Sequence, residues 1–321
     1  NTSADITIAS IYKEENGEYK QISNIPEEGY ILNEERSTCN NNAKPKWDKE
    51  TNNLEISNLK ESGTECNLYF DKQLTGSETI LGNITVNSGT PNFVNASTTD
   101  EGVYQVSDGM YGGYSYYWRG AATTNHVIFA DKCWRIVRIN GDKTMRLIYN
   151  GSVKEENVCA GNGVNAESVI VGSTDAEKYY ATSDGQYNNS SYVGWTYTLG
   201  SQRTTSGTAS NAKAQTEKWY NANITGTNAN KIADGKFCND RDVGQPHSTW
   251  SGTWATTWNA TGTQFAYAGV DRLWNEYQPA LDCPTGDIYT LKVGAITADE
   301  VEFAGGKNED NTSYYLYNGQ S

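Results

Sequence analysis

The sequence is poor in the residues and motifs on which most enzymes depend. Its 321 residues include only two histidines, His126 and His247, although histidine is the side chain most often used as a general base. No GxSxG, HExxH, P-loop or GxGxxG pattern stands in a convincing context. We therefore expect a protein that is not an enzyme. His126 precedes a strand-like run and is interpreted as structural, whereas His247 lies in a polar stretch and could assist a ligand site.

The chain also lacks an apolar run long enough to cross a bilayer. No signal peptide and no initiating methionine are present, and a start at Asn1-Thr2-Ser3 is typical of a mature or trimmed product. The net charge of -14 would repel the phosphates of nucleic acids and an anionic membrane surface. Neither a nucleic-acid partner nor a transmembrane segment is expected.

Six cysteines are present, and none of them belongs to a CxxC pair. Metal sites and thioredoxin-like centres usually need such close spacing, so disulfides are the better interpretation. Pairing neighbours along the chain predicts three bridges: Cys39–Cys66, Cys133–Cys159 and Cys238–Cys283. Disulfides persist in oxidising compartments. Together with the abundant Asn, Thr, Ser, Gly and Tyr, they predict an extracellular or cell-surface protein.

The pattern of short β-rich runs divides the chain into regions. Residues 1–72 predict a small disulfide-linked β domain, in which runs such as ITIASIY and CNLYF alternate with turn signals. Residues 73–103 hold few apolar side chains and read as a linker. From 104 to 321 we expect a second module, with a hairpin turning at Asn140-Gly141. Its segment 210–222 is rich in helix formers, and Ser210 is a suitable N-cap.

Several stretches of the second module occur together in a fixed order: TPNFVNASTTDEGVYQ, YYWRG, CWRIVRINGDKTMRLIYNG, EKWYNANI, FCNDR, DRLWN and GAITADEVEFAGG. With the STCNNN…GTECNLYF pattern before them, they resemble secreted or surface proteins of low-GC Gram-positive gut bacteria. Those proteins carry a module related to the formylglycine-generating-enzyme and C-type-lectin-like folds. The resemblance covers most of residues 25–317. It implies an α+β chain, with a small all-β domain before a C-type-lectin-like module of mostly strand and loop and few short helices.

The chain departs from that family pattern in three ways. It lacks the close pair of reactive cysteines of formylglycine-generating enzymes. Calcium-dependent lectins use a Glu/Gln-Pro-Asn/Asp motif and a Trp-Asn-Asp motif, and this chain offers only Gln245-Pro246-His247 and Trp258-Asn259-Ala260. Modules of this kind also continue past the equivalent of NTSYYLYNG, so we expect that closing C-terminal strands are absent or are supplied by another chain through β-augmentation.

An aromatic set in the segment 244–263 is the best candidate for a ligand site. Trp250, Trp254 and Trp258 recur every four residues, and on a strand they would share one side. Exposed aromatic rings can stack on sugars or anchor a protein partner. Tyr116 and Tyr117, with Tyr114, are candidates for the same face, and His247 could assist. The alternative is that these rings fill the core of the module, because large aromatic side chains are mostly buried.

The carboxylates near this set favour a structural role. Acidic and basic residues alternate here: Asp240, Arg241 and Asp242, and then Asp271 and Arg272. This alternation favours ion pairs that hold loops over a catalytic role. We expect no cofactor, although structural calcium on such loops and a Lys–Asn isopeptide bond both stay open.

A second acidic group occupies VGAITADEVEFAGG, residues 293–306. Thr297 and Glu300 have the spacing of a capping box, and Asp299 lies in the first turn, where the helix dipole favours negative charge. Gly305 and Gly306 suit a left-handed exit. The segment therefore predicts a short helix rather than a catalytic site.

These observations favour a non-enzymatic surface protein that acts in adhesion or ligand binding. Its partner would be a host or bacterial surface glycan, a surface protein, or other copies of itself. Two alternatives remain: a structural subunit of an extracellular filament or pilus-like appendage completed by strand exchange, and a carbohydrate-active enzyme on the same scaffold.

Overall fold

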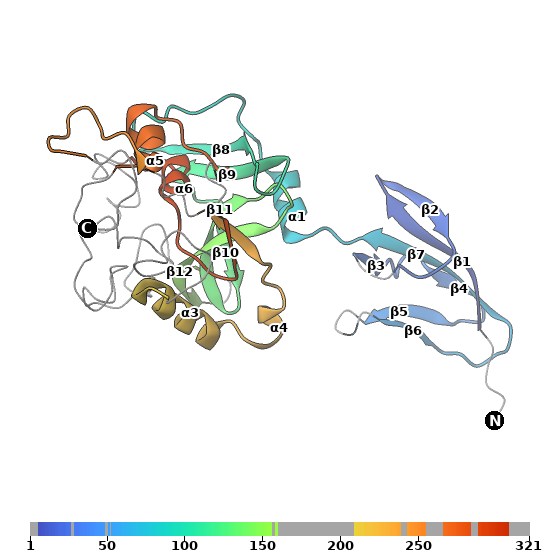
Figure 1. Ribbon diagram of the computed structural model, residues 1–321. Helices are drawn as coiled ribbons and strands as arrows, with labels where there is room; N and C mark the ends of the chain where they lie inside the picture. The colour runs from blue at the N-terminus through green and yellow to red at the C-terminus, as the bar shows by residue number, and fades with distance from the viewer. Residues whose placement is uncertain are drawn as a thin grey trace. The chain divides into compact units, whose positions relative to one another are not determined.

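A computed structural model describes residues 6–26, 29–48, 51, 53–155, 158–159, 209–238, 243–254, 266–283 and 288–307. The chain divides into two compact units, Asn1–Asn83 and Ile84–Ser321 (Figure 1). Over the described residues it is mostly strand and loop with few short helices. The segment 73–103, expected to be a linker, contains a helix, α1 (Gly76–Asn83), and the start of strand β8 at Asp100.

The first unit is a small β structure. Its strands are β1 (Ile6–Glu15), β2 (Glu18–Ile22), β3 (Tyr30–Leu32), β4 (Thr38–Cys39), β5 (Lys44–Asp48), β6 (Asn53–Ser57) and β7 (Thr64–Lys72). The main sheet has the order β2-β1-β7-β3, with β4 also paired to β7, while β5 and β6 form a separate hairpin. The tight turn between β1 and β2 places Asn16 and Gly17 at positive φ, as Asn-Gly hairpin turns require.

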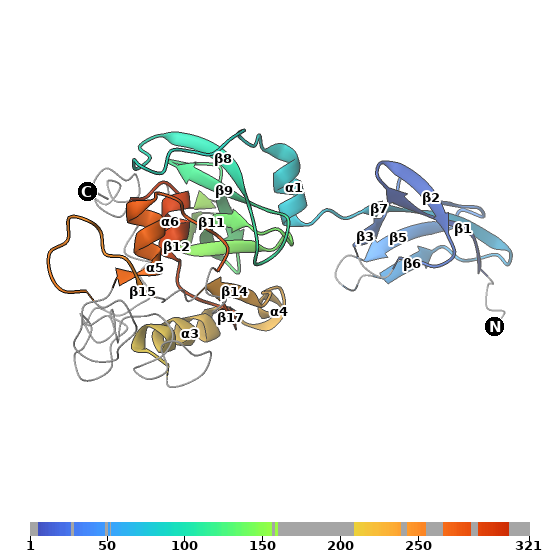
Figure 2. The same cartoon turned by 45° about the horizontal axis from the view of Figure 1, so that its top comes forward.

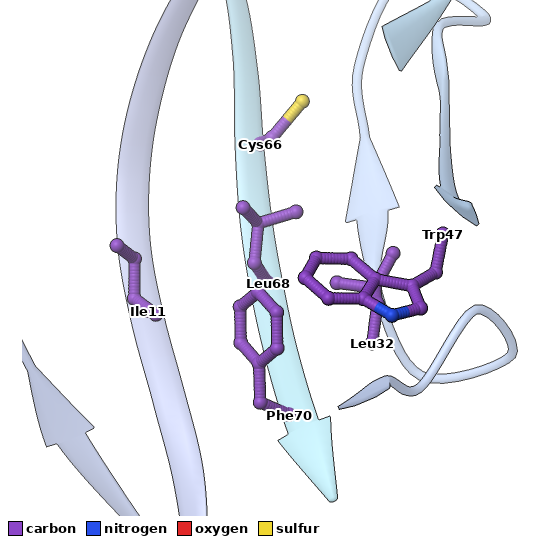
Figure 3. Close-up of a cluster of buried hydrophobic side chains, with 6 residues drawn as sticks. All are labelled: Ile11, Leu32, Trp47, Cys66, Leu68 and Phe70. Atoms are coloured by element: carbon purple, nitrogen blue, oxygen red, sulfur yellow. The ribbon is translucent and has the colours of Figure 1, made fainter. Parts of the chain in front are cut away.

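Strand β7 supplies the core of this unit because its side chains alternate between buried and exposed. Cys66, Leu68 and Phe70 point to one face, where they meet residues from β1, β3 and β5 (Figure 3). The Trp47 and Phe70 rings pack edge to face, with centroids 5.6 Å apart. Every side chain of this cluster is apolar: Ile11, Leu32, Trp47, Cys66, Leu68 and Phe70.

The second unit is built on a larger antiparallel sheet. Its strands are β8 (Asp100–Ser107), β9 (Tyr114–Gly120), β10 (His126–Phe129), β11 (Lys132–Ile139), β12 (Met145–Glu155) and β13 (Val158–Cys159). They follow the order β13-β12-β11-β9-β8, and β10 also pairs with β11. The hairpin expected at Asn140-Gly141 joins β11 to β12, and its connection spans residues 140–144, closed by a 2.8 Å bond from Asn140 N–H to Thr144 O.

Short elements complete the second unit. They are α3 (Asn211–Asn223), α4 (Gly226–Ala229), β14 (Gly235–Cys238), β15 (Val243–Gly244), β16 (Ala266–Tyr267), α5 (Ala268–Val270), the π-helical turn η2 (Asp271–Asn275), β17 (Ile288–Leu291) and α6 (Ala298–Phe303). The predicted N-cap of α3 is confirmed, since the Ser210 side chain accepts a bond from Lys213 N–H. Trp219 of α3 packs on Trp134 and Tyr149, which places this helix against the sheet (Figure 2).

All three predicted disulfides are present. Cys39–Cys66 joins β4 to β7, Cys133–Cys159 joins β11 to β13, and Cys238–Cys283 fixes the end of β14 to the segment after η2. Each loop closure contributes about 3 kcal/mol by restricting the unfolded chain. Among the helices of the described ranges, none has the length and apolar character needed to span a membrane.

Candidate functional site

The aromatic residues of the segment 245–254 do not lie on a strand, contrary to expectation. Strand β15 ends at Gly244, and the chain then turns so that Trp250 N–H donates to His247 O at 2.9 Å. Gly252 follows at a φ of 125°, a conformation that side chains with a Cβ rarely adopt. The run of Ser, Thr and Gly therefore favours a turning loop over an extended strand.

The loop nevertheless brings the expected rings together. Trp250 stacks on Trp254 with centroids 5.2 Å apart and an interplanar angle of 28°. The His247 ring lies 6.2 Å from Trp250, and its Nδ1 is 2.8 Å from the Thr249 hydroxyl. All three side chains are half-buried. Trp258, the third member of the predicted set, lies outside the described residues.

Trp274, which the sequence did not single out, is the fourth member of the cluster. It comes from η2, and its ring contacts Trp250 at 4.8 Å and His247 at 5.3 Å, both nearly edge to face. Its presence depends on a contact between segments more than twenty residues apart in the sequence. Sequence spacing alone gave no signal for that contact. We call His247, Trp250, Trp254 and Trp274 the aromatic cluster.

Asp271 anchors the loop to η2. Both of its carboxylate oxygens lie 3.1 Å from the backbone nitrogen of Gln245, and Asn275 Nδ2 donates to the same side chain at 3.1 Å. Arg272 does not pair with Asp271, since it binds Asp299 through two bonds of 3.1 and 2.9 Å. The expected ion pairs of Asp240, Arg241 and Asp242 lie outside the described residues.

The aromatic cluster lies in a segment without charged side chains. Residues 244–254 carry no Asp, Glu, Lys or Arg side chain, so they offer rings, hydroxyls and amides to a ligand. The carboxylate of Asp271, on η2, already accepts the bond from Gln245 that holds the loop. Over the described part of the chain, no group of three or more His, Cys, Asp or Glu side chains is placed to hold a metal ion.

The two tyrosines predicted for this face lie on β9, not on the loop. Tyr117 is 3% exposed and packs against Phe303 at 4.7 Å, so it is a core residue and cannot contact a ligand. Burial raises the pKa of its hydroxyl. Tyr116 is half-buried beneath Lys143, whose Nζ lies 5.2 Å from the ring centroid. Tyr114 is 53% exposed.

His126 has a structural setting. It lies on β10 opposite Arg135, and its Nδ1 is 3.2 Å from Thr123 O. Burial is the main cause that lowers the pKa of the imidazole, and Arg135 lowers it further. The neutral ring is therefore favoured at neutral pH.

The acidic segment 297–303 is a capped helix, as predicted. In α6, Thr297 and Glu300 form both bonds of the capping box, at 3.1 and 3.0 Å. Glu300 is bound by Arg138 at 3.1 Å and by Arg146 at 2.6 Å. Gly305 follows at a φ of 101°, the left-handed exit that was expected. The carboxylate of Glu300 therefore holds α6 to β11 and β12.

A second group of rings, in the first unit, was not predicted. Tyr12 of β1 stacks on its cross-strand partner Tyr69 of β7, with centroids 4.7 Å apart. Tyr19 meets Tyr69 edge to face, and the Arg36 guanidinium lies 4.4 Å from the Tyr19 centroid. Side chains alternate along β7, so the sequence could have predicted that Tyr69 lies on the other face of the strand from Leu68 and Phe70. The pairing of β1 with β7, which brings Tyr12 to Tyr69, could not be predicted from the sequence.

Comparison with protein-family models, with curated protein sequences and with solved structures found no match.

Proposed function

We propose that this chain is a non-enzymatic extracellular surface protein that binds a neutral glycan through the aromatic cluster, within a module of the C-type-lectin-like kind. The single observation that carries the proposal is the gathering of three tryptophans and His247 on one loop and η2, all half-buried. The apolar faces of sugar rings stack on aromatic side chains, and their hydroxyls bond to side chains such as those of Ser and Thr. Three disulfides support a location outside the cell.

Charge favours a neutral ligand over an ionic one. The segment 244–254 is uncharged in a chain whose net charge is -14. An anionic ligand would be repelled by the whole molecule. A cationic ligand would be drawn to carboxylates, and this loop has none of its own. A neutral glycan is the class that such a surface fits best.

The proposal is tested by glycan-array binding of the wild-type chain, followed by titration of the best ligand against variants. Trp254→Ala is expected to weaken binding at least tenfold, because it removes one stacking ring. Trp219→Ala is the matched control, since it removes another half-buried tryptophan, one that packs on the sheet at Trp134. It should lower the melting temperature and leave affinity unchanged.

Two results would contradict the proposal. Trp254→Ala could lower the melting temperature with no change in affinity, which would make the cluster a packing feature. Alternatively, turnover of the bound glycan would assign the chain to carbohydrate-active enzymes. A hydrolysis assay on the same ligand distinguishes the second case.

One observation favours self-assembly as a second candidate function. Strand β1 pairs with β2 only from Ile11 onward, so the edge of residues 6–10 on that side has no partner strand among the described residues. Ile6 and Ile8 are 37% and 41% exposed there, and open apolar edges template strand pairing. Copies joined edge to edge would form dimers or filaments.

Light scattering after size-exclusion chromatography tests this second candidate. If the edge pairs, apparent mass rises with concentration and Ile8→Lys abolishes the rise. Ile128→Lys is the control, because Ile128 is similarly exposed, at 38%, on β10 of the other unit. A monomer at every concentration would remove the candidate.

A further inference from the structure

The carboxyl end of helix α6 is bound to strand β9 and to the segment that precedes β8. Gly120 N–H donates to Ala304 O at 2.9 Å, and Ser97 N–H donates to Gly305 O at 2.8 Å. Arg119 of β9 donates through Nη1 to the Glu302 carbonyl oxygen at 2.6 Å. The Phe303 ring packs on Phe93 at 5.4 Å. This end of the helix is therefore tied to the sheet both by backbone bonds and by apolar packing.

The fit is tight at this junction. A Cβ added at Gly305 would lie 2.6 Å from the Ser97 side chain, and one added at Gly120 would lie 1.8 Å from Thr99 O. Such distances leave no room for a side chain. The helix end and the strand end therefore contact each other directly through glycine backbone.

Two glutamates on α6 have opposite settings. Glu300 is buried, and both its oxygens accept bonds, from Arg138, Arg146 and its own capping box. Glu302 is also buried, with 2% of its surface exposed. Neither of its carboxylate oxygens has a hydrogen-bond partner among the residues that the structure describes. A charged carboxylate in that position would be strongly destabilising, whereas the protonated acid is tolerated.

The charged groups around Glu302 do not offset the cost of burying its ionised carboxylate. Asp299, one turn earlier on α6, adds a negative charge. Arg119 from β9 attracts the carboxylate, but its Nε is bound to Glu101 of β8 at 2.9 Å, and its Nη groups bond to the carbonyl oxygens of Glu302, Asn92 and Asn95. Lys307, after the helix, also attracts it. Burial, followed by Asp299, raises the pKa of Glu302 to about 8 despite both cations.

We infer that α6 is a pH-sensitive latch: protonated Glu302 keeps the helix docked on β9 and on the segment that precedes β8, and loss of that proton releases it. In the released helix the carboxyl group meets water and regains an ordinary pKa near 4.5. Release is therefore coupled to the loss of one proton at any pH between the two values. The population of the released form rises about tenfold per pH unit from about pH 5 to pH 7.5 and levels off above about pH 8.

Hydrogen exchange of the full-length chain, followed by mass spectrometry between pH 5 and pH 9, tests the latch. After correction for the intrinsic pH dependence of exchange, protection of the amides at 298–305 should fall about tenfold per pH unit up to about pH 7.5. The amides of β11 should remain protected at times when those of α6 have exchanged, because release is local. Cleavage by trypsin after Lys307 should accelerate in parallel.

Glu302→Gln is the decisive variant, since it keeps the shape and removes the ionisation. It should abolish the slope at 298–305 and leave these amides protected at pH 8. Glu302→Met gives the same expectation with an apolar side chain, in case the amide is poorly accommodated. Glu276→Gln, at an exposed position of the same unit, should retain the wild-type slope. A wild-type profile without a slope, or an unchanged slope in both Glu302 variants, would overturn the inference.

Discussion

The two units of this chain are stabilised by different chemistry. Within the described residues of the first unit, no charged side chain is buried, and the centre is an apolar cluster on β7. The described part of the second unit buries several charged side chains next to its apolar ones: Asp108, Arg119, Arg135, Arg138, Lys213, Asp299, Glu300 and Glu302. Most of them lie where α6 meets the sheet.

This difference has consequences for energetics. Apolar burial stabilises by about 25 cal/mol for each Å² removed from water and depends little on pH. A buried ion pair gains little net stability over an apolar pair, yet the loss of one partner leaves an uncompensated charge. The stability of the first unit should therefore be lowered most by substitutions that create cavities. The stability of the second unit should be lowered most by removal of a buried charge and should depend on pH.

The largest effect is expected from Arg138→Leu. Arg138 is 1% exposed and pairs with Asp108 at 3.3 Å and Glu300 at 3.1 Å, so its removal leaves two buried carboxylates with fewer partners. The free energy of unfolding of the second unit should fall by about 4 kcal/mol, measured in urea by hydrogen exchange of β11. Lys20→Leu, which removes the surface ion pair of Lys20 with Glu15 at 2.8 Å, should change the stability of the first unit little. Similar effects of the two variants would contradict the comparison.

Leu68→Ala should destabilise the first unit through a cavity. Leu68 is fully buried within the apolar cluster (Figure 3), and such truncations cost about 3 kcal/mol. Exchange of β7 amides in urea measures the loss, while β11 amides should be unchanged. Leu74→Ala, at a position that is 53% exposed, is the control and should be nearly neutral. Equal losses at both leucines would show that β7 is not the core.

Thr297→Ala should have the smallest effect, about 1 kcal/mol on the second unit. It removes the hydroxyl that accepts Glu300 N–H at 3.1 Å, while Glu300 keeps its two arginines. Urea unfolding measures the change. Thr297→Ser keeps the hydroxyl and should retain wild-type stability. If serine were as destabilising as alanine, the capping bond would not be the cause.

Local features of this chain could be predicted from sequence, and distant contacts could not. The capping box at Thr297 and the N-cap at Ser210 depend on residues three apart, so their spacing was sufficient. The disulfides followed from the pairing of neighbours. The contact between the rings of Trp274 and Trp250 depends on packing between distant segments. The burial of Tyr117 depends on the docking of α6, which no local pattern encodes.

Two carboxyl groups of α6, those of Glu300 and Glu302, have pKa values shifted in opposite directions. The pH dependence of stability therefore distinguishes the second unit from the first most clearly. Burial alone would raise the pKa of Glu300, but Arg146, Arg138 and the Thr297 N–H together lower it. The stability that Glu300 contributes is therefore present above about pH 4.5 and lost as pH falls through its lower folded value. Glu302 acts in the opposite direction, since its folded pKa is raised, and it removes stability as pH rises from about 4.5 to about 8.

The most direct test is the free energy of unfolding of each unit, measured in urea by hydrogen exchange of β7 and β11 from pH 3 to pH 9. We expect a maximum for the second unit near about pH 4.5, with losses as pH falls through the lower pKa of Glu300 and as pH rises toward the pKa of Glu302. The first unit should vary little. The pKa of Glu15 is lowered to about 2 chiefly by Lys13, and that of Glu78 is lowered to about 2 by the Thr75 N–H and then by Lys72, but both groups lie at the surface, where such interactions contribute little. Parallel profiles for the two units would contradict the claim that one is held by apolar packing and the other by buried charge.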